Sequence, residues 1–288
     1  MSEISILKVK ELREKTSAGF GDCKSALTEA NGDMDLAIEL LKAKGMSRAQ
    51  KKTGREASEG LIGVSHDGYG KASVVEVNSE TDYVARSSDF QDIVRKIAKI
   101  ALSTDGSVEE VLSAPFDDTG IVVKDGIKAG IAIIGENISL RRSSVLSVGE
   151  GVVSSYVHAA ISEGIGKIGV LVALKSSGDK EKLSSIGVQI AMHVAASSPL
   201  AISSQRLDSS IVDRRRAIYV EEVRDSGKPE NLVERIVEGK MQKFFKEVVL
   251  LSQDFVMNTD QTVFDFLKDS EKEIHASIEI VGVVHFAR

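Results

Sequence analysis

The hydrophobic pattern of this chain changes near Gly60, and this change constrains the fold more than any other feature. Before it, apolar residues recur every three or four positions, as they do on one face of an amphipathic helix. Beyond it, the short apolar runs 61–64 and 72–77 flank Asp67 and Gly68, which is typical of a β-hairpin. Helical and strand-like segments then follow one another to the C-terminus. The sequence therefore predicts an α+β protein with antiparallel sheets.

Residues 1–45 are predicted to form a small unit of three short helices. The second and third helices are expected to be capped by Asp22 and Asp33, whose carboxylates can accept hydrogen bonds from free backbone amides. Gly45 is expected to end the third helix, because glycine is favoured at helix C-termini. Residues 46–58 are rich in Lys, Arg, Gln and Ser, and are interpreted as a linker or an exposed helix.

The rest of the chain is predicted to form two similar α+β subdomains, at 59–148 and 149–288. Segment 71–77 leads into a helix in the same way as segment 167–173 does, which suggests a repeated unit. The elements expected after the hairpin are, in order, helices at about 88–102 and 119–134, strands at 137–148, 152–157 and 168–174, a helix at about 180–196 and a last strand at 277–286.

A helical hairpin inserted in the second subdomain is predicted at about 208–248. Gly227 can end its first helix and Pro229 can open its second, since proline is favoured in the first turn of a helix. Apolar residues, among them Ile211 and Leu232, recur along both predicted helices at helical spacing. This apolar stripe is compatible either with a homodimer or with contact to another protein.

Composition limits the classes of function. The 288 residues carry a net charge of −6, whereas a protein that mainly binds nucleic acid would carry a basic excess. The single cysteine, Cys23, excludes a disulfide within the chain and is expected to be a small buried residue of a helix. Residues 1–5 do not resemble a signal peptide, and no apolar run approaches the roughly 20 residues of a membrane span. We therefore expect a cytoplasmic protein with no nucleic acid and no membrane as partner.

Signatures of catalysis and of phosphate binding are missing from the sequence. Gly166–Lys167 and Gly227–Lys228 lack the upstream glycine and the following hydroxyl residue of a phosphate-binding loop. The five histidines are not spaced as metal ligands. We therefore expect no enzyme, no cofactor, no metal site and no direct nucleotide binding. The residues by themselves indicate a soluble α+β protein that binds another protein.

Longer stretches of the chain resemble signatures of the elongation factor Ts family. They are Leu12–Leu27, Ser79–Arg86 and Ala191–Pro199, with supporting matches at Gly135–Ile138 and Val237–Met241. The matches follow the order of the family over most of the chain, so together they are specific although each alone is weak. The resemblance implies a ubiquitin-associated-like helical domain followed by two related α+β subdomains with an inserted helical hairpin.

The resemblance also implies an activity. Members of the family bind the GTPase elongation factor Tu in its GDP state and promote GDP release without covalent chemistry. They insert an Asp and the following aromatic residue between helices of the GTPase domain, which disturbs the Mg²⁺ and phosphate contacts of the nucleotide. The positions that match this wedge are Thr81, Asp82, Tyr83 and Val84. Further contacts with the partner are implied at Arg13, Phe20, Gly21 and His158.

Three features depart from the pattern of the family. Tyr83 stands where Phe is usual, so its hydroxyl must stay in water or find a hydrogen-bond partner. Gly21 replaces a larger apolar residue of many members, which predicts a smaller N-terminal contact. Some members reach the partner with a C-terminal helix, and this contact is expected to be missing because the sequence ends at Arg288, directly after the last predicted strand.

Other interpretations of these residues remain open at the level of sequence. Without the resemblance, Asp82 is interpreted as a helix cap and Tyr83 as a buried aromatic residue. The first stretch also fits a ubiquitin-associated-type adaptor without exchange activity. Such an adaptor would not need the second and third stretches. A further alternative is an RNA-binding factor that uses the basic stretch 48–55, although the net negative charge disfavours it.

Overall fold

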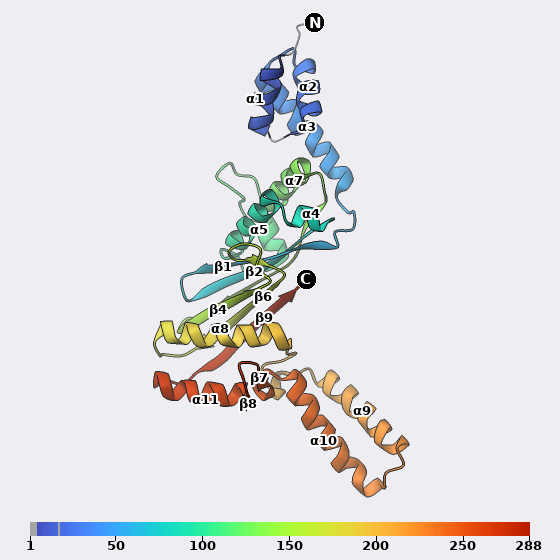
Figure 1. Cartoon of the computed structure of the whole chain (residues 1–288), viewed down its shortest axis with the longest axis vertical. Coiled ribbons are helices and arrows are strands. Elements are labelled where there is room, and N and C mark those ends of the chain that lie inside the picture. The colour runs from blue at the N-terminus through green and yellow to red at the C-terminus, as the bar shows by residue number, and fades with distance from the viewer. Residues whose placement is uncertain (1–4, 17) are drawn as a thin grey trace.

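The computed structural model describes residues 5–16 and 18–288, with the side chain of residue 48 excepted. Figure 1 shows an elongated molecule with the N-terminal helices at one end, a helical hairpin at the other and packed sheets between them. The signal-peptide prediction rests on residues 1–5, and of these residues 1–4 lie outside the described part. Within the described ranges, no helix is long and apolar enough to cross a membrane.

The N-terminal helices are α1 (Ile6–Thr16), α2 (Phe20–Glu29) and α3 (Met34–Lys52). Cys23 is fully buried among them, as expected, and its thiol donates a weak hydrogen bond to the carbonyl of Ala18. Asp33 caps α3 by accepting from the amide of Leu36 at 2.9 Å, which confirms that prediction. The cap predicted at Asp22 is wrong, because α2 begins at Phe20 and Asp22 therefore lies inside its first turn.

The sequence predicted that the third helix ends at Gly45, but α3 continues to Lys52. Its second half lies against α7 (Val123–Ile134), as Figure 1 shows. A Cβ atom at Gly45 would lie only 3.0 Å from the Cβ of Ala132, so the glycine marks the close approach of two helices. Packing against α7 outweighs the helix penalty of glycine, about 1 kcal/mol relative to alanine. The predicted domain boundary at residue 45 thus falls within a continuous helix.

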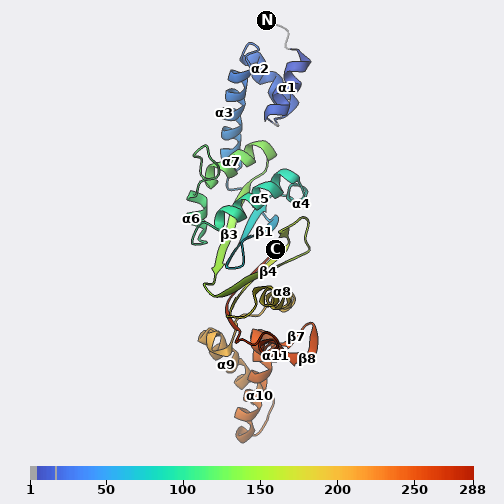
Figure 2. The same ribbon diagram turned by 90° about the vertical axis from the view of Figure 1, so that its left-hand side faces the viewer.

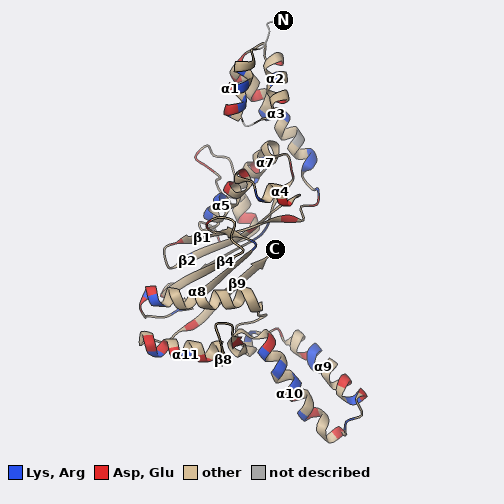
Figure 3. Ribbon diagram, viewed as in Figure 1, with Lys and Arg blue, Asp and Glu red and all other residues tan. Residues whose placement is uncertain are grey.

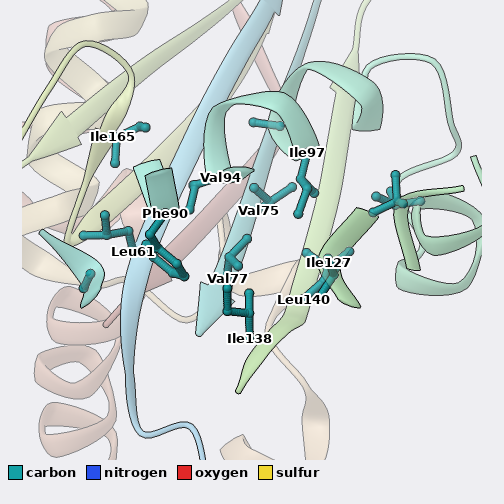
Figure 4. Packing of buried hydrophobic residues seen from close by; sticks show 14 of the residues in the cluster. Leu61, Val75, Val77, Phe90, Val94, Ile97, Ile127, Ile138, Leu140 and Ile165 are labelled. Atoms are coloured by element: carbon teal, nitrogen blue, oxygen red, sulfur yellow. The ribbon is translucent and has the colours of Figure 1, made fainter. Parts of the chain in front are cut away.

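The first sheet has the strand order β3-β2-β1-β5, and all its pairings are antiparallel. Its strands are β1 (Glu59–Asp67), β2 (Lys71–Ser79), β3 (Ile138–Ser147) and β5 (Ile165–Gly166). Helices α5 (Ser88–Ala101), α6 (Val108–Ser113) and α7 cover its outer face. Figure 4 shows the aliphatic core between them, in which Val75 and Val77 of β2 contact Phe90 and Ile97 of α5.

The second sheet has the antiparallel order β4-β6-β9, from β4 (Gly151–His158), β6 (Ile168–Lys175) and β9 (Glu279–Ala287). Helices α8 (Lys180–Ser197) and α11 (Val263–Ile274) cover its outer face. The inner faces of the two sheets pack together through Ile62, Val74 and Ala72 on one side and Val153, Leu171 and Ala173 on the other. The layers therefore run helix, sheet, sheet, helix, and the predicted α+β class is confirmed.

The inserted hairpin consists of α9 (Ser209–Asp225) and α10 (Glu230–Val248), close to the predicted limits. Its seam buries Val223 against Val237 and Met241, whereas Ile211 and Leu232 face solvent. Acidic and basic residues are interspersed along both helices, as the ribbon colours in Figure 3 show. Short elements complete the chain, namely α4 (Asp82–Ala85), the 3₁₀ turns Ser204–Arg206 and Leu250–Ser252, and the ribbon of β7 (Asp254–Phe255) and β8 (Asn258–Thr262).

Candidate functional site

The stretch Ser79–Arg86 forms the connection from β2 to α5, and its centre is the single-turn helix α4. Thr81 caps this helix, since its Oγ1 accepts a hydrogen bond from the amide of Val84 at 3.3 Å. Val84 and Ala85 are buried in the core under the first sheet. The inner side of α4 is thereby anchored, while its outer side lies at the periphery of the molecule (Figure 2).

Tyr83 is on that outer side, with 87% of its surface exposed. It is the most exposed large apolar side chain in the described part of the chain. The alternative that Tyr83 is a core aromatic residue is therefore wrong, because one short helical turn directs Val84 and Ala85 inward and leaves their neighbour outside. The phenolic hydroxyl remains in water, so the substitution of Phe by Tyr costs nothing in the free protein.

Asp82 is the first residue of α4, and its carboxylate is held between two cations. Its Oδ1 accepts a hydrogen bond from Nζ of Lys167 at 3.3 Å, and its Oδ2 accepts one from Nε of Arg86 at 2.8 Å. The hydrogen bond from Lys167, followed by that from Arg86, lowers the pKa of Asp82. The carboxylate is thus ionised at neutral pH. The cap itself is Thr81, so the alternative that Asp82 caps the helix is wrong.

The start of α4 is held by a residue from a distant part of the chain, Glu136. Its Oε2 accepts from the amide of Thr81 at 2.9 Å, and its Oε1 accepts from the hydroxyl of Thr81 at 2.7 Å. Gly135 ends α7 in the left-handed conformation, with φ of 86°, and turns the chain so that Glu136 reaches Thr81. Neither Glu136 nor Lys167 was predicted as a site residue. The match at Gly135–Ile138 was the available signal for Glu136.

His158 is the last residue of β4 and is exposed. Its Nδ1 lies 3.1 Å from the hydroxyl of Tyr156, and its carbonyl accepts from the amide of Lys167 at 3.2 Å. The side-chain ammonium of the same residue, Lys167, donates to Asp82. The structure therefore brings the end of β4 close to α4, although the two segments are far apart in sequence.

Arg13, Phe20 and Gly21 lie apart from α4, on the N-terminal helices (Figure 1). All three are exposed, and Phe20 exposes 44% of its surface. A Cβ atom at Gly21 would meet no other atom within 4 Å. The space beside Gly21 is open, so packing inside this chain does not explain the glycine.

The third stretch, Ala191–Pro199, contains a histidine with the opposite environment. His193 is fully buried on α8, where its Nδ1 accepts from the amide of Val256 at 3.2 Å. Its Nε2 must then carry the proton, and it donates to Oε1 of Gln253 at 2.9 Å. Burial lowers the pKa of His193. This residue joins α8 to the β7–β8 ribbon and has no access to a partner.

No group of His, Cys, Asp and Glu side chains in the described residues could hold a metal ion. A hollow of about 630 Å³ lies between the N-terminal helices and α7 and is lined mainly by aliphatic side chains such as Leu41, Ile121 and Ile133. It lies away from Asp82 and His158. The features gathered at α4 are instead an exposed aromatic ring beside an ionised carboxylate on a well-anchored turn. Fold and site thus define an α+β protein with an anchored surface turn that exposes an aromatic ring.

Comparison with known proteins agrees with this description. The family model described as "Elongation factor TS" matches residues 80–287. Proteins called elongation factor Ts are 58% identical in Rhizobium etli (strain CIAT 652), and 57% identical in Sinorhizobium medicae (strain WSM419) and Agrobacterium fabrum (strain C58). These matches cover 97–99% of this chain and 91–92% of each relative. The chain belongs to the elongation factor Ts family, as its sequence predicted, and is a translation elongation factor.

Proposed function

We propose that this chain binds elongation factor Tu in its GDP form and accelerates GDP release by inserting Asp82 and Tyr83 between helices of the GTPase domain. Family membership supports the partner. The observation that carries the mechanism is the exposure of Tyr83, which places 87% of an aromatic side chain in water on a turn whose other side is buried. An exposed ring on an anchored turn can enter a partner without any rearrangement of its own core.

The energy of such a wedge is adequate for exchange. A buried aromatic side chain removes roughly 150–250 Å² from water, which at about 25 cal/mol per Å² gives an upper limit of about 4–6 kcal/mol. Binding of the chain and binding of GDP to the partner are thermodynamically linked. Each ~1.4 kcal/mol by which the wedge favours the nucleotide-free partner over the GDP-bound one therefore weakens GDP binding tenfold. Even a part of the available energy therefore changes GDP affinity by orders of magnitude.

Asp82 contributes charge to the wedge at a reduced desolvation cost. An isolated carboxylate is expensive to remove from water, whereas a paired one retains favourable interactions as it is buried. Asp82 enters the interface with Lys167 and Arg86 already bonded to its two oxygens. A carboxylate near the Mg²⁺ and phosphate contacts of the partner competes with them and favours loss of the nucleotide.

The remaining family positions extend the contact. Arg13 and Phe20 reach the GTPase domain from the N-terminal helices, and the open space beside Gly21 makes this part of the interface smaller. His158 contacts the partner next to α4, because its strand ends beside Lys167. The chain makes and breaks no covalent bond and needs no cofactor. Its effect on the partner is a change of binding equilibrium.

The test is the release of fluorescently labelled GDP from elongation factor Tu, with and without the chain. We expect release to accelerate with chain concentration and to saturate. Unchanged release at micromolar concentrations would contradict the proposal. Binding without any acceleration would instead identify a simple adaptor.

A further inference from the structure

The carboxylate of Glu136 uses both oxygens to hold one residue, Thr81. The backbone amide of Thr81 donates to Oε2 at 2.9 Å and its hydroxyl donates to Oε1 at 2.7 Å. The same hydroxyl oxygen accepts from the amide of Val84 at 3.3 Å and so caps α4. One carboxylate therefore fixes both the backbone and the cap of the turn that carries Tyr83.

The loop that carries Glu136 is itself tied on two sides. The amide of Asn137 donates to Oε1 of Glu80 at 2.6 Å, which makes the bond between the two segments reciprocal. The side-chain amide of Asn137 donates to the carbonyl of Arg55 at 2.6 Å, and the ammonium of Lys52 donates to the carbonyl of Gly135. The end of α3, the end of α7 and the start of α4 therefore form one hydrogen-bonded platform.

A platform of this kind has a physical purpose, because α4 is too short to be stable alone. A helix of four residues lacks the repeated hydrogen bonds that offset the cost of nucleation. Val84 and Ala85 anchor its inner side, whereas Thr81, which precedes the helix and caps it, is exposed. Lys167 and Arg86 hold Asp82, and the contact with Glu136 adds the constraint on Thr81.

We propose that Glu136 is a positioning residue, which holds Thr81 and thereby keeps Tyr83 in the orientation that enters the partner. The role in exchange rests on the function proposed above. Glu136 acts by raising the fraction of chains whose turn is ready to bind. Its loss should therefore raise the concentration of chain needed for half-maximal exchange and leave the maximal rate nearly unchanged.

The order of the turn can be measured without the partner, because the chain contains no tryptophan. Tyr83→Trp places a single tryptophan at an exposed position that tolerates its size. In this background we expect Glu136→Ala to lower tryptophan anisotropy and to leave the thermal unfolding midpoint nearly unchanged. Glu136→Gln, which keeps an acceptor for Thr81, should give an intermediate value. The matched control is Glu273→Gln, which makes the same change of charge at an exposed position on α11, away from the site. It should alter neither the tryptophan anisotropy nor the thermal unfolding midpoint.

A double-mutant cycle isolates the contact itself. Thr81→Val removes the hydroxyl and keeps the backbone amide, so it breaks one of the two bonds to Glu136. The anisotropy losses of Thr81→Val and Glu136→Ala should be less than additive when combined, since both remove the same bond. Fully additive losses, or an unchanged anisotropy in Glu136→Ala, would overturn the inference.

Exchange kinetics with the Tyr83 chain then test the consequence. Glu136→Ala should raise the half-saturating concentration about three- to tenfold, the shift expected when surface hydrogen bonds to a charged group are lost. The maximal rate should stay within about twofold, since Glu136 itself does not enter the partner. If Glu136→Ala lowers the anisotropy but leaves the half-saturating concentration of the chain unchanged, the positioning role is overturned. If the unaltered chain fails to accelerate GDP release, the proposed function is wrong, and the anisotropy result still decides whether Glu136 orders the turn.

Discussion

Two stretches that resemble family signatures, Ser79–Arg86 and Ala191–Pro199, have opposite places in the molecule. The first carries Tyr83, which exposes 87% of its surface on a turn outside the first sheet. The second carries His193, which is fully buried and hydrogen-bonded through both ring nitrogens. The two stretches look alike as motifs. They differ in whether their rings are available to a partner.

The difference shows that one family signature can lie on an exposed turn and another in a packed core. Both ring nitrogens of His193 are hydrogen-bonded within the chain, one to Val256 in the turn between β7 and β8 and the other to the loop residue Gln253. Beside Tyr83, hydrogen bonds hold Thr81 and Asp82, while 87% of the surface of Tyr83 itself is exposed. Changes in the first stretch should therefore affect exchange, and changes in the second should affect stability.

The largest effect is expected for Asp82→Ala combined with Tyr83→Ala. Removing the wedge should slow stimulated GDP release about 100-fold or more, since central interface residues contribute 2 kcal/mol or more each. The unfolding midpoint should hardly move, because neither side chain is part of the core. Labelled-GDP release and thermal unfolding measure the two outcomes. Equal exchange by the variant would show that the wedge lies elsewhere.

The converse change is His193→Ala. It leaves a cavity, removes the acceptor of the Val256 amide, and leaves Gln253 Oε1 with the hydroxyl of Ser197 as its remaining donor. The free energy of unfolding should therefore fall by about 2–4 kcal/mol. Exchange per folded molecule should be preserved. The stability control is His158→Ala, which removes an exposed imidazole and should change unfolding by less than about 0.5 kcal/mol. Similar losses of stability in both variants would show that the buried position of His193 does not set its contribution.

The same contrast predicts a pH dependence. Burial lowers the pKa of His193, so the unfolded chain binds its proton more readily than the folded one. The stability contributed by neutral His193 is complete above the unfolded pKa, about 6.5, and is lost as the pH falls below it. Urea unfolding between pH 7.5 and pH 5.5 should show this loss, and His193→Gln should flatten the curve. Asp82 should contribute in the same direction but at lower pH, since its pKa is also lowered.

The smallest effect is expected at the N-terminal helices, for Gly21→Val. The added side chain enters open space, so stability should change by less than about 0.5 kcal/mol. If this position contacts the partner, each buried methylene contributes about 0.8 kcal/mol, and affinity should rise a few-fold. Titration of labelled elongation factor Tu measures the change. Weaker binding would show that the interface needs the glycine itself.

Much of the fold was predictable, because its signals are local. The β1–β2 hairpin, α5, α8 and both helices of the inserted hairpin were predicted close to their observed limits. Helix α11 was not predicted, although Thr262 and Asp265 form a reciprocal cap at its start. The end of α3 was predicted at Gly45 because glycine commonly ends helices, but its contact with Ala132 of α7 is a tertiary feature with no local signal.

The sequence by itself determined the α+β class, the order of most of the longer elements and the family, and it identified Asp82 and Tyr83 as a candidate wedge. Only the tertiary structure decided that Tyr83 faces solvent and that Glu136 and Lys167 reach the wedge from 55 and 85 positions away. The reason is physical. Helix caps and hydrophobic periodicity depend on residues a few positions apart, whereas the direction of a side chain depends on long-range packing, which brings distant segments together only in the folded chain.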